Sequence, residues 1–214
     1  MNELSGLCIV SPLNRQHYAQ ELEAYFHLRK EVLIDQRGWD LIACDGREMD
    51  QFDHEHAHYL LFKSNEAGEV LGGVRLTPSV APNLTMDIFS HLIDPCHGFA
   101  RSLQVWEASR FVTTSCEMGI KKGLIREITL LLFIGMIEYG LSHNVHSFLT
   151  MTEIRLERIA RMVGWHLRRL GNVEQVGNTY AVVGLAEVSE SMRQKMRASA
   201  EISRPVFLNE LPHL

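Results

Sequence analysis

Residues 123–141 form the strongest apolar stretch of the chain, and they constrain its fold more than any other segment. Leu, Ile, Phe and Met side chains fall on nearly every side of a helix drawn through them, with Arg126, Glu127 and Glu138 as the exceptions. This length favours a helix over a strand, and a helix that is apolar all round is buried. Because no run of about 18 apolar residues occurs, we expect a helix in a protein core and no membrane span.

Apolar periodicity on both sides of this helix predicts the remaining elements. Strands are expected at residues 7–10, 57–63, 70–76, 103–113, 145–151, 166–170 and 180–188, and helices at 14–36, 86–92, 154–163 and 190–199. Residues 65–68 carry a hairpin turn signal, residues 40–55 are expected to form a loop, and the tail from about residue 200 is expected to be irregular. Strands that first pair locally and then alternate with helices predict one α/β (α+β) domain over residues 1–214, with a mixed twisted sheet flanked by helices.

Charge and composition exclude several classes of protein. The formal net charge of −5 argues against a nucleic-acid binder that relies on bulk charge, because phosphate neutralisation requires a basic surface. The four cysteines are widely spaced without a C-x-x-C pair, which indicates reduced thiols in a cytoplasmic protein, and the first residues lack a secretory signal. His54, His56 and His58 alternate, but no H-E-x-x-H pattern is present, so no metal site is expected.

Charged residues between positions 29 and 110 lie inside segments that are otherwise rich in core residues. They are Arg29, Asp50, Asp53, Arg75, Glu107 and Arg110. Each one alone is ordinarily a solvated residue or part of a structural ion pair. Because buried charges are costly unless they are paired, the set predicts an arginine–carboxylate network, which either holds the fold together or lines a pocket for a zwitterion. Glu107 and Arg110 are three apart and point to opposite faces of a regular strand, unless a bulge intervenes.

Four motifs in order carry a family resemblance. They are R-x-x-V-x6-W from Arg29 to Trp39, D-x-F-D at residues 50–53, G-x-x-R-L-x-P at 72–78 and W-E-x-S-R-F at 106–111. In order and spacing they resemble the LuxI-type autoinducer synthases, the N-acyl-homoserine-lactone synthases, over roughly residues 5–188. The resemblance implies a fold similar to that of the GNAT-like N-acetyltransferases.

The resemblance also implies a reaction that produces a quorum-sensing signal. The amine of S-adenosylmethionine attacks an acyl thioester carried by acyl carrier protein or coenzyme A. The methionyl carboxylate then displaces the sulfonium, which closes the lactone and releases methylthioadenosine. S-adenosylmethionine is a cosubstrate in this reaction, and no tightly bound cofactor is implied.

The matched positions imply roles for individual residues. Glu107 is the expected base for the amine, directly or through a water, because an ammonium must lose a proton before it attacks. Asp50 is expected to hold the ammonium, and Arg110 to hold the methionyl carboxylate or brace the acids. The residues expected to bind the cosubstrate or support this geometry are Arg29, Trp39, Asp53, Arg75 and Phe111.

The resemblance is less specific for the residues that would bind the acyl chain. The positions that match the acyl slot of the family are Met136, Leu149, Thr150 and Thr152, and ordinary core packing explains the same residues equally well. A threonine near position 150 hints at an oxygen on the third acyl carbon, while branched or aryl groups on coenzyme A stay open. Leu33 departs from the family, which often has an aromatic residue there, and leucine offers no cation–π contact to a sulfonium.

A basic surface is expected to bind the acyl donor. Its candidate residues are Lys121, Lys122, Arg126, Arg155 and Arg158. Acyl carrier proteins are acidic, so such a patch would steer their docking. Two alternatives stay open: an acyl-coenzyme A N-acyltransferase of the same fold that acts on another amine, and a ligand-binding protein without catalysis. Release of methylthioadenosine separates the synthase from both.

Overall fold

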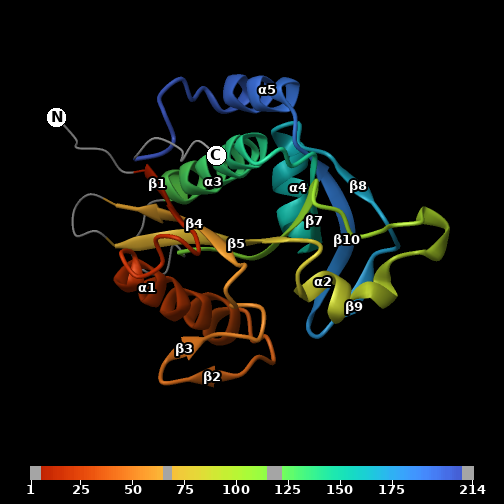
Figure 1. Cartoon of the computed structure of the whole chain (residues 1–214), viewed down its shortest axis with the longest axis horizontal. Coiled ribbons are helices and arrows are strands. Elements are labelled where there is room, and N and C mark those ends of the chain that lie inside the picture. The colour runs from red at the N-terminus through yellow and green to blue at the C-terminus, as the bar shows by residue number, and fades with distance from the viewer. Residues whose placement is uncertain (1–5, 65–68, 115–121, 209–214) are drawn as a thin grey trace. The chain divides into compact units, whose positions relative to one another are not determined.

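The computed structural model describes residues 6–64, 69–114 and 122–208, and Figure 1 shows its mixed α/β fold. The strands of the large sheet follow the order β1 (Gly6–Val10), β4 (His58–Lys63), β5 (Val70–Pro78), β6 (Val105–Thr113), β7 (Ser147–Glu153), β10 (Thr179–Glu187) and β8 (Leu167–Arg169), with β9 (Glu174–Val176) beside β10. The α-helices are α1 (Ala19–Arg29), α2 (Leu84–Asp87), α3 (Lys122–Ser142), α4 (Ile154–Met162) and α5 (Glu190–Ala200). The predicted class, a mixed sheet with helices, is confirmed.

The backbone divides into two compact units. The first unit comprises Met1–Arg75, Arg110–Gly135 and Pro205–Leu211, and the second comprises Leu76–Ser109, Met136–Arg204 and Pro212–Leu214. The expectation of a single domain over residues 1–214 stays a prediction.

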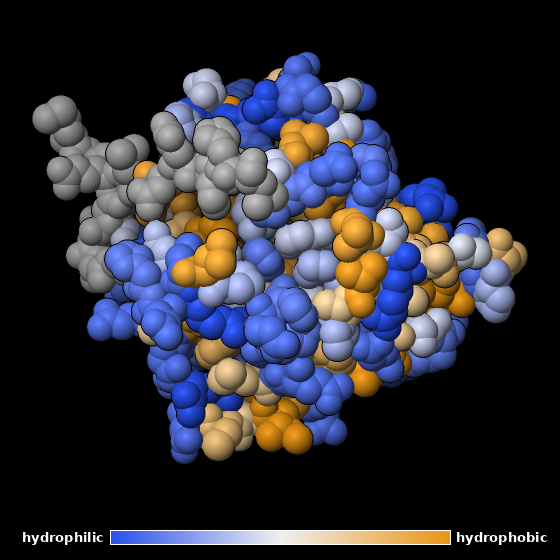
Figure 2. Space-filling view, viewed as in Figure 1, coloured by the Kyte–Doolittle hydropathy of each residue, from blue (hydrophilic) through white to orange (hydrophobic). Residues whose placement is uncertain are grey.

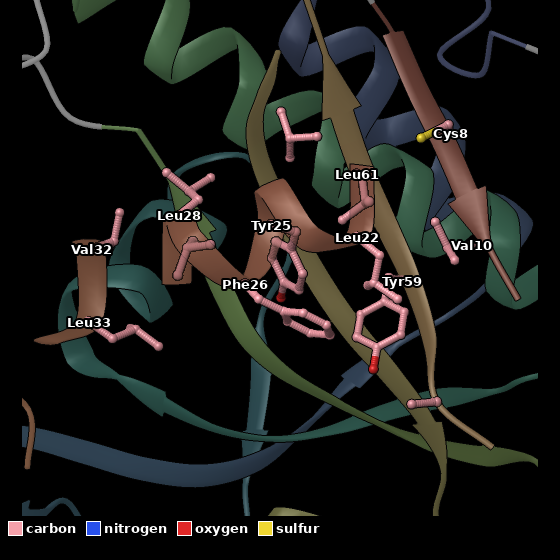
Figure 3. Close-up of a cluster of buried hydrophobic side chains, with 13 residues drawn as sticks. Cys8, Val10, Leu22, Tyr25, Phe26, Leu28, Val32, Leu33, Tyr59 and Leu61 are labelled. Atoms are coloured by element: carbon pink, nitrogen blue, oxygen red, sulfur yellow. The ribbon is translucent and has the colours of Figure 1, made fainter. Parts of the chain in front are cut away.

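The core of the first unit lies beneath α1 (Figure 3). Leu22, Tyr25 and Leu28 recur at helical spacing and are buried, as the apolar periodicity predicts. After Arg29 the helix continues as a π-helical segment, Lys30–Gln36. The ring of Tyr25 meets that of Tyr59 on β4 edge-on, with 5.8 Å between centroids. These contacts fasten the helix that carries Arg29 to the sheet.

In the second unit, β7 and β10 form an antiparallel pair in which Leu149 lies opposite Leu185. The two parallel strands β6 and β7 pair over a short register, with Val105–Glu107 against Ser147–Leu149. Leu149 and Leu185 belong to a buried cluster with Leu170 and Val183. The cluster holds the segment that carries Glu107 beside β7.

The predicted central helix is confirmed as α3, and Ile128, Leu131, Ile134 and Ile137 are fully buried. Within residues 6–64, 69–114 and 122–208, none of the helices combines the length and the apolar content that crossing a membrane requires. On the face shown in Figure 2, hydrophilic residues predominate and apolar residues form small groups, which is normal for a globular surface.

The segment from 40 to 55 differs from the expected loop. It contains a two-stranded sheet, β2 (Ala43–Cys44) with β3 (Arg47–Glu48), and Asp45 and Gly46 at its tip adopt left-handed φ values of 52° and 79°. Nδ1 of His27 lies 2.8 Å from the carbonyl oxygen of Gly46, which ties the hairpin to α1. The sequence did not predict this hairpin, because its side chains are mostly exposed and polar and therefore show no apolar alternation, while its pairing is made by the backbone.

Other boundaries differ as well. The first helix begins at Ala19 instead of Asn14, because the Asn14 side chain accepts from the Ser11 amide at 2.7 Å and closes a turn there. The short polar strand β9 carries no apolar alternation and was not predicted. Residues 201–208 form no helix and no named strand, as expected for the tail, and the Leu7 amide donates to the carbonyl oxygen of the buried Val206 at 2.8 Å. The predicted turn at 65–68 lies outside the described residues.

Gly135 on α3 permits close packing within the first unit, since an added Cβ would collide with Leu7 of β1 and come within 3.0 Å of Leu60. We predict that Gly135→Ala lowers the free energy of unfolding by about 1–3 kcal/mol through overpacking, measured by urea denaturation. Gly123→Ala on the same helix is the control: a Cβ there has no neighbour within 4 Å among the described residues, and alanine raises stability by up to about 1 kcal/mol. Equal shifts in both variants would contradict the packing argument.

Candidate functional site

The site begins with Arg29, the last residue of α1, which is fully buried. Its Nε donates to Glu48 at 2.5 Å, and its two terminal nitrogens donate to the two oxygens of Asp53 at 2.8 and 3.0 Å. The guanidinium also lies over the rings of Tyr25 and Phe26, 5.5 and 5.2 Å from their centroids. Because the Arg29 guanidinium is buried away from solvent, two carboxylates accept its hydrogen bonds and two aromatic rings lie against it.

Arg75 extends the network from β5. It is fully buried and donates to both oxygens of Asp50, at 2.5 and 3.2 Å. It also lies 3.0 Å from Oδ1 of Asp53, so Asp53 bridges Arg29 and Arg75. The backbone supports this arrangement, because the Asp50 amide donates to Asp53 Oδ2 at 2.9 Å.

Arg110 on β6 completes the network. Its Nη2 lies 3.1 Å from Glu48 and 2.7 Å from Asp50. Arg110 has a φ of +55°, which is uncommon for a residue with a side chain and interrupts the regular conformation of the strand. The sequence left open whether the strand is regular between Glu107 and Arg110, and the backbone is irregular at Arg110.

Three guanidinium groups thus meet three carboxylates in the first unit, and their formal charges balance. Five of the six residues predicted for the network, Arg29, Asp50, Asp53, Arg75 and Arg110, pair in this way. The sixth, Glu107, was expected to belong to it, but it accepts hydrogen bonds from backbone amides of the second unit. The third acid of the network is Glu48, which sequence reasoning assigned to a loop. Glu48 is 1% exposed, whereas Asp50 is 18% exposed, so Asp50 is the member that a ligand from solvent reaches most easily.

Two carboxylates of this network, Asp50 and Asp53, stay ionised. Burial raises the pKa of Asp53, but the charges of Arg29 and Arg75 outweigh it and bring the pKa well below its ordinary value. Burial likewise raises the pKa of Asp50. The charges of Arg75 and Arg110 lower it by more than burial raises it, so the net shift is downward. A carboxylate of this kind is a weak base and a good partner for a cation.

Tyr59 is a second residue that sequence reasoning missed. Its hydroxyl donates to Asp53 at 3.0 Å and lies 3.1 Å from a terminal nitrogen of Arg15. Burial raises the pKa of Tyr59, so the hydroxyl stays protonated and able to donate. The periodic apolar pattern of β4 gave no signal for this role, because a core tyrosine and a hydrogen-bonding tyrosine occupy the same strand position.

Glu107 has its partners within the second unit. It is fully buried, and its two oxygens accept from the backbone amides of Leu84 at 3.3 Å and Thr85 at 2.5 Å, at the start of α2. These contacts fix the orientation of the carboxylate. The role of Glu107 as a base stays a prediction.

Trp39 and Phe111, the aromatic residues expected to bind the cosubstrate, are half-buried in the first unit. Trp39 packs on the α1 cluster, and its indole Nε1 is buried without an acceptor in the described part of the chain. Such an N–H group is available to a ligand, because a buried donor without a partner is costly. Phe111 stacks at a tilt on Phe133, with 5.3 Å between centroids. Leu33 is 1% exposed and belongs to the core.

The four residues expected to line the acyl slot all lie in the second unit. Alternation along β7 places Leu149 on one face of the sheet and both Thr150 and Thr152 on the other. Phe148 shares the face of the threonines and approaches Gly140 of α3, one helical turn after Met136. Met136 and the two threonines are therefore compatible with one slot, while Leu149 packs in the cluster of the opposite face.

No metal site emerges from the described residues, which contain no group of three or more His, Cys, Asp or Glu side chains placed to hold an ion. His54 and His56 lie near each other, with ring centroids 5.6 Å apart.

Comparison of the sequence with known proteins identifies its family. The family model described as autoinducer synthase matches residues 14–196. A probable acyl-homoserine-lactone synthase of Sinorhizobium fredii is 34% identical over 192 residues, which cover 89% of this chain and 91% of that protein. An acyl-homoserine-lactone synthase of Agrobacterium fabrum is 36% identical over 176 residues, which cover 82% of each chain.

Solved structures of similar fold agree with this result. MesI, a coenzyme A-dependent acyl-homoserine lactone synthase, aligns with a TM-score of 0.80 and 26% identity over 95% of this chain and all of that one. BjaI, solved with SAM and isopentyl-CoA, aligns with a TM-score of 0.85 and 24% identity over 99% of this chain and 96% of that one. A solved structure described as a putative N-acetyltransferase from Lactobacillus plantarum aligns with a TM-score of 0.53 and 18% identity over 86% of this chain and 99% of that one. This likeness confirms the expected GNAT-like fold. The chain belongs to the autoinducer synthase family.

Proposed function

We propose that the chain makes an acyl-homoserine lactone from S-adenosylmethionine and an acyl thioester. The observation that carries this proposal is the buried network, which presents one ionised and partly exposed carboxylate, Asp50, to a cationic ligand. Membership of the autoinducer synthase family supports it. BjaI, which shares the fold, has been solved with SAM and isopentyl-CoA, and also with MTA.

Two steps account for the product. The amine of S-adenosylmethionine, once deprotonated, attacks the thioester carbonyl, an amide forms and the donor thiol leaves. A methionyl carboxylate oxygen then attacks the carbon bound to sulfur, the carbon–sulfur bond breaks, and neutral methylthioadenosine leaves as the lactone closes. The protein therefore has to hold the amine, the methionyl carboxylate and the thioester in fixed positions relative to one another.

Within this scheme, Asp50 binds the methionyl ammonium because Arg75 and Arg110 keep it ionised. Of the two roles open to Arg110, bracing the acids is the better supported, since its guanidinium already contacts Glu48 and Asp50. The position of Asp50 is supported by three buried side chains, those of Arg29, Asp53 and Arg75. Trp39 and Phe111 supply aromatic surface for the cosubstrate, and the Trp39 N–H offers a donor.

Glu107 is proposed as the base that removes the amine proton, directly or through a water. The two backbone amides of α2 hold its carboxylate in one orientation, which suits a group that must meet a proton at a defined position. For the acyl chain, we propose a slot formed by Met136, Thr150 and Thr152, with Leu149 supporting it from the opposite face of β7.

The first prediction concerns the products. Incubation of the full chain with S-adenosylmethionine and a panel of straight, branched and aryl acyl donors, each on coenzyme A and on acyl carrier protein, is expected to yield an acyl-homoserine lactone and methylthioadenosine in equal amounts, measured by mass spectrometry. Acyl transfer without methylthioadenosine would instead favour an N-acyltransferase acting on another amine. Absence of turnover with every donor would favour a binding protein.

The second prediction separates the two acids. Glu107→Gln is expected to lower kcat by about 10²- to 10⁴-fold, the usual contribution of a general base, with the Kd of S-adenosylmethionine little changed. Asp50→Asn is expected to weaken S-adenosylmethionine binding, because the ammonium loses its ionised partner. Circular dichroism checks that both variants fold. A Glu107→Gln variant with full activity would contradict the assignment of the base.

The third prediction concerns the donor surface. Arg155 and Arg158 are both exposed on α4 and lie three apart, on nearly the same helix face. We propose that they attract an acidic acyl carrier protein. Arg126 is exposed on α3 in the first unit, while Lys121 and the side chain of Lys122 lie outside the described residues.

Arg155→Glu is expected to raise the KM for a carrier-bound donor about tenfold, because a like charge then faces the acidic partner, and added salt is expected to reduce the difference. The same donor group on coenzyme A is expected to show a smaller change. Lys195→Glu on α5 is the matched control, since it makes the same charge change at another exposed position of the second unit. An equal effect of both variants would argue against docking at α4.

A further inference from the structure

Arg110 adopts a backbone conformation that its side chain disfavours. Its φ of +55° lies in the left-handed region, which is unfavourable for a residue with a Cβ and persists only where the surroundings impose it. The neighbouring positions continue as strand β6. Because this turn in the backbone sets the direction of the Arg110 side chain, whatever imposes it also decides whether the guanidinium reaches Asp50.

Tyr25 supplies the constraint from α1. Its hydroxyl donates to the carbonyl oxygen of Arg110 at 2.6 Å, and both groups are buried. Burial raises the pKa of Tyr25, so the hydroxyl remains a donor. The ring is fully buried in the α1 cluster (Figure 3), where Tyr59 and Phe26 pack around it. A ring held in this way places its hydroxyl at a defined point.

Gly73 makes this placement of the ring possible. A Cβ at position 73 of β5 would lie 2.7 Å from Cε2 and 2.8 Å from Cδ2 of Tyr25, closer than atoms approach without a shift. The ring is rigid and packed on its other sides, so it has little freedom to give way. Gly73, which follows the first glycine of the G-x-x-R motif, therefore leaves space for the tyrosine that meets Arg110.

We propose that Tyr25 is a positioning residue for S-adenosylmethionine, which acts by holding the backbone of Arg110 so that its guanidinium keeps Asp50 in place. This inference rests on the proposed function, in which Asp50 binds the methionyl ammonium. Tyr25 itself touches no reacting atom in this scheme. Its effect on binding passes through Arg110 and is confined to the methionyl end of the ligand.

Calorimetric titration of the full chain with two ligands tests the inference. S-adenosylmethionine carries the ammonium and carboxylate, whereas 5′-methylthioadenosine lacks both and keeps the adenosine and sulfur. Tyr25→Phe is expected to raise the Kd of S-adenosylmethionine about tenfold, the loss expected from one buried hydrogen bond, and to leave that of methylthioadenosine within about twofold. A variant that weakens both ligands equally would show a general structural role and overturn the inference.

A double-mutant cycle with Arg110→Ala provides the second readout. In the Arg110→Ala background, Tyr25→Phe is expected to cause no further loss of S-adenosylmethionine affinity, because the group it positions is absent. Additive losses would overturn the inference.

Tyr180→Phe serves as the control for removal of a tyrosine hydroxyl, because Tyr180 is 61% exposed on β10. It is expected to change neither affinity. If the wild-type chain binds no S-adenosylmethionine, the proposed function fails. If the wild type binds and Tyr25→Phe binds equally well, only the positioning role fails.

Discussion

A buried network of three arginines and three carboxylates is the interaction on which the first unit depends. Buried charges of this kind are tolerated only when each one is paired, and removal of one partner typically costs about 3–5 kcal/mol because it leaves an uncompensated charge. The network therefore sets requirements for the elements around it. The helix α1 has to carry Arg29 on its buried side, the hairpin β2–β3 has to place Glu48 beside it, and β6 has to turn its backbone at Arg110.

The same network underlies the division of roles proposed for Asp50 and Glu107. Arginine charges lower the pKa of Asp50 and Asp53, which suits these carboxylates to binding a cation and makes them poor proton acceptors. A reaction that needs a free amine must therefore find its base outside the network. Glu107, buried and held by two backbone amides, is a carboxylate in a different environment, and two acids in different environments are a common way to divide binding from proton transfer.

Binding of the acyl chain depends on shape and apolar packing and not on paired charges. Its candidate residues lie on a strand and a helix of the second unit, where shape and apolar packing decide which chain fits. Thr150 and Thr152 bring hydroxyl groups to one face of β7, while Leu149 belongs to the opposite face. A difference of one methylene group in such a slot changes binding by about 1–3 kcal/mol, so a slot of this kind discriminates only weakly between acyl chains of neighbouring length.

The amino-acid sequence by itself determined the mixed α/β class, the central helix α3, most strands and the family, because apolar periodicity and four ordered motifs are local features. It also indicated that arginines and acids from distant segments pair. Only the tertiary structure decided which acids do so: Glu48 looked like a residue of a polar loop, and Tyr25 and Tyr59 looked like ordinary core residues. Their roles depend on hydrogen bonds between groups that are 19, 85 and 6 positions apart in the chain and on a left-handed backbone at Arg110, and no local pattern encodes such contacts.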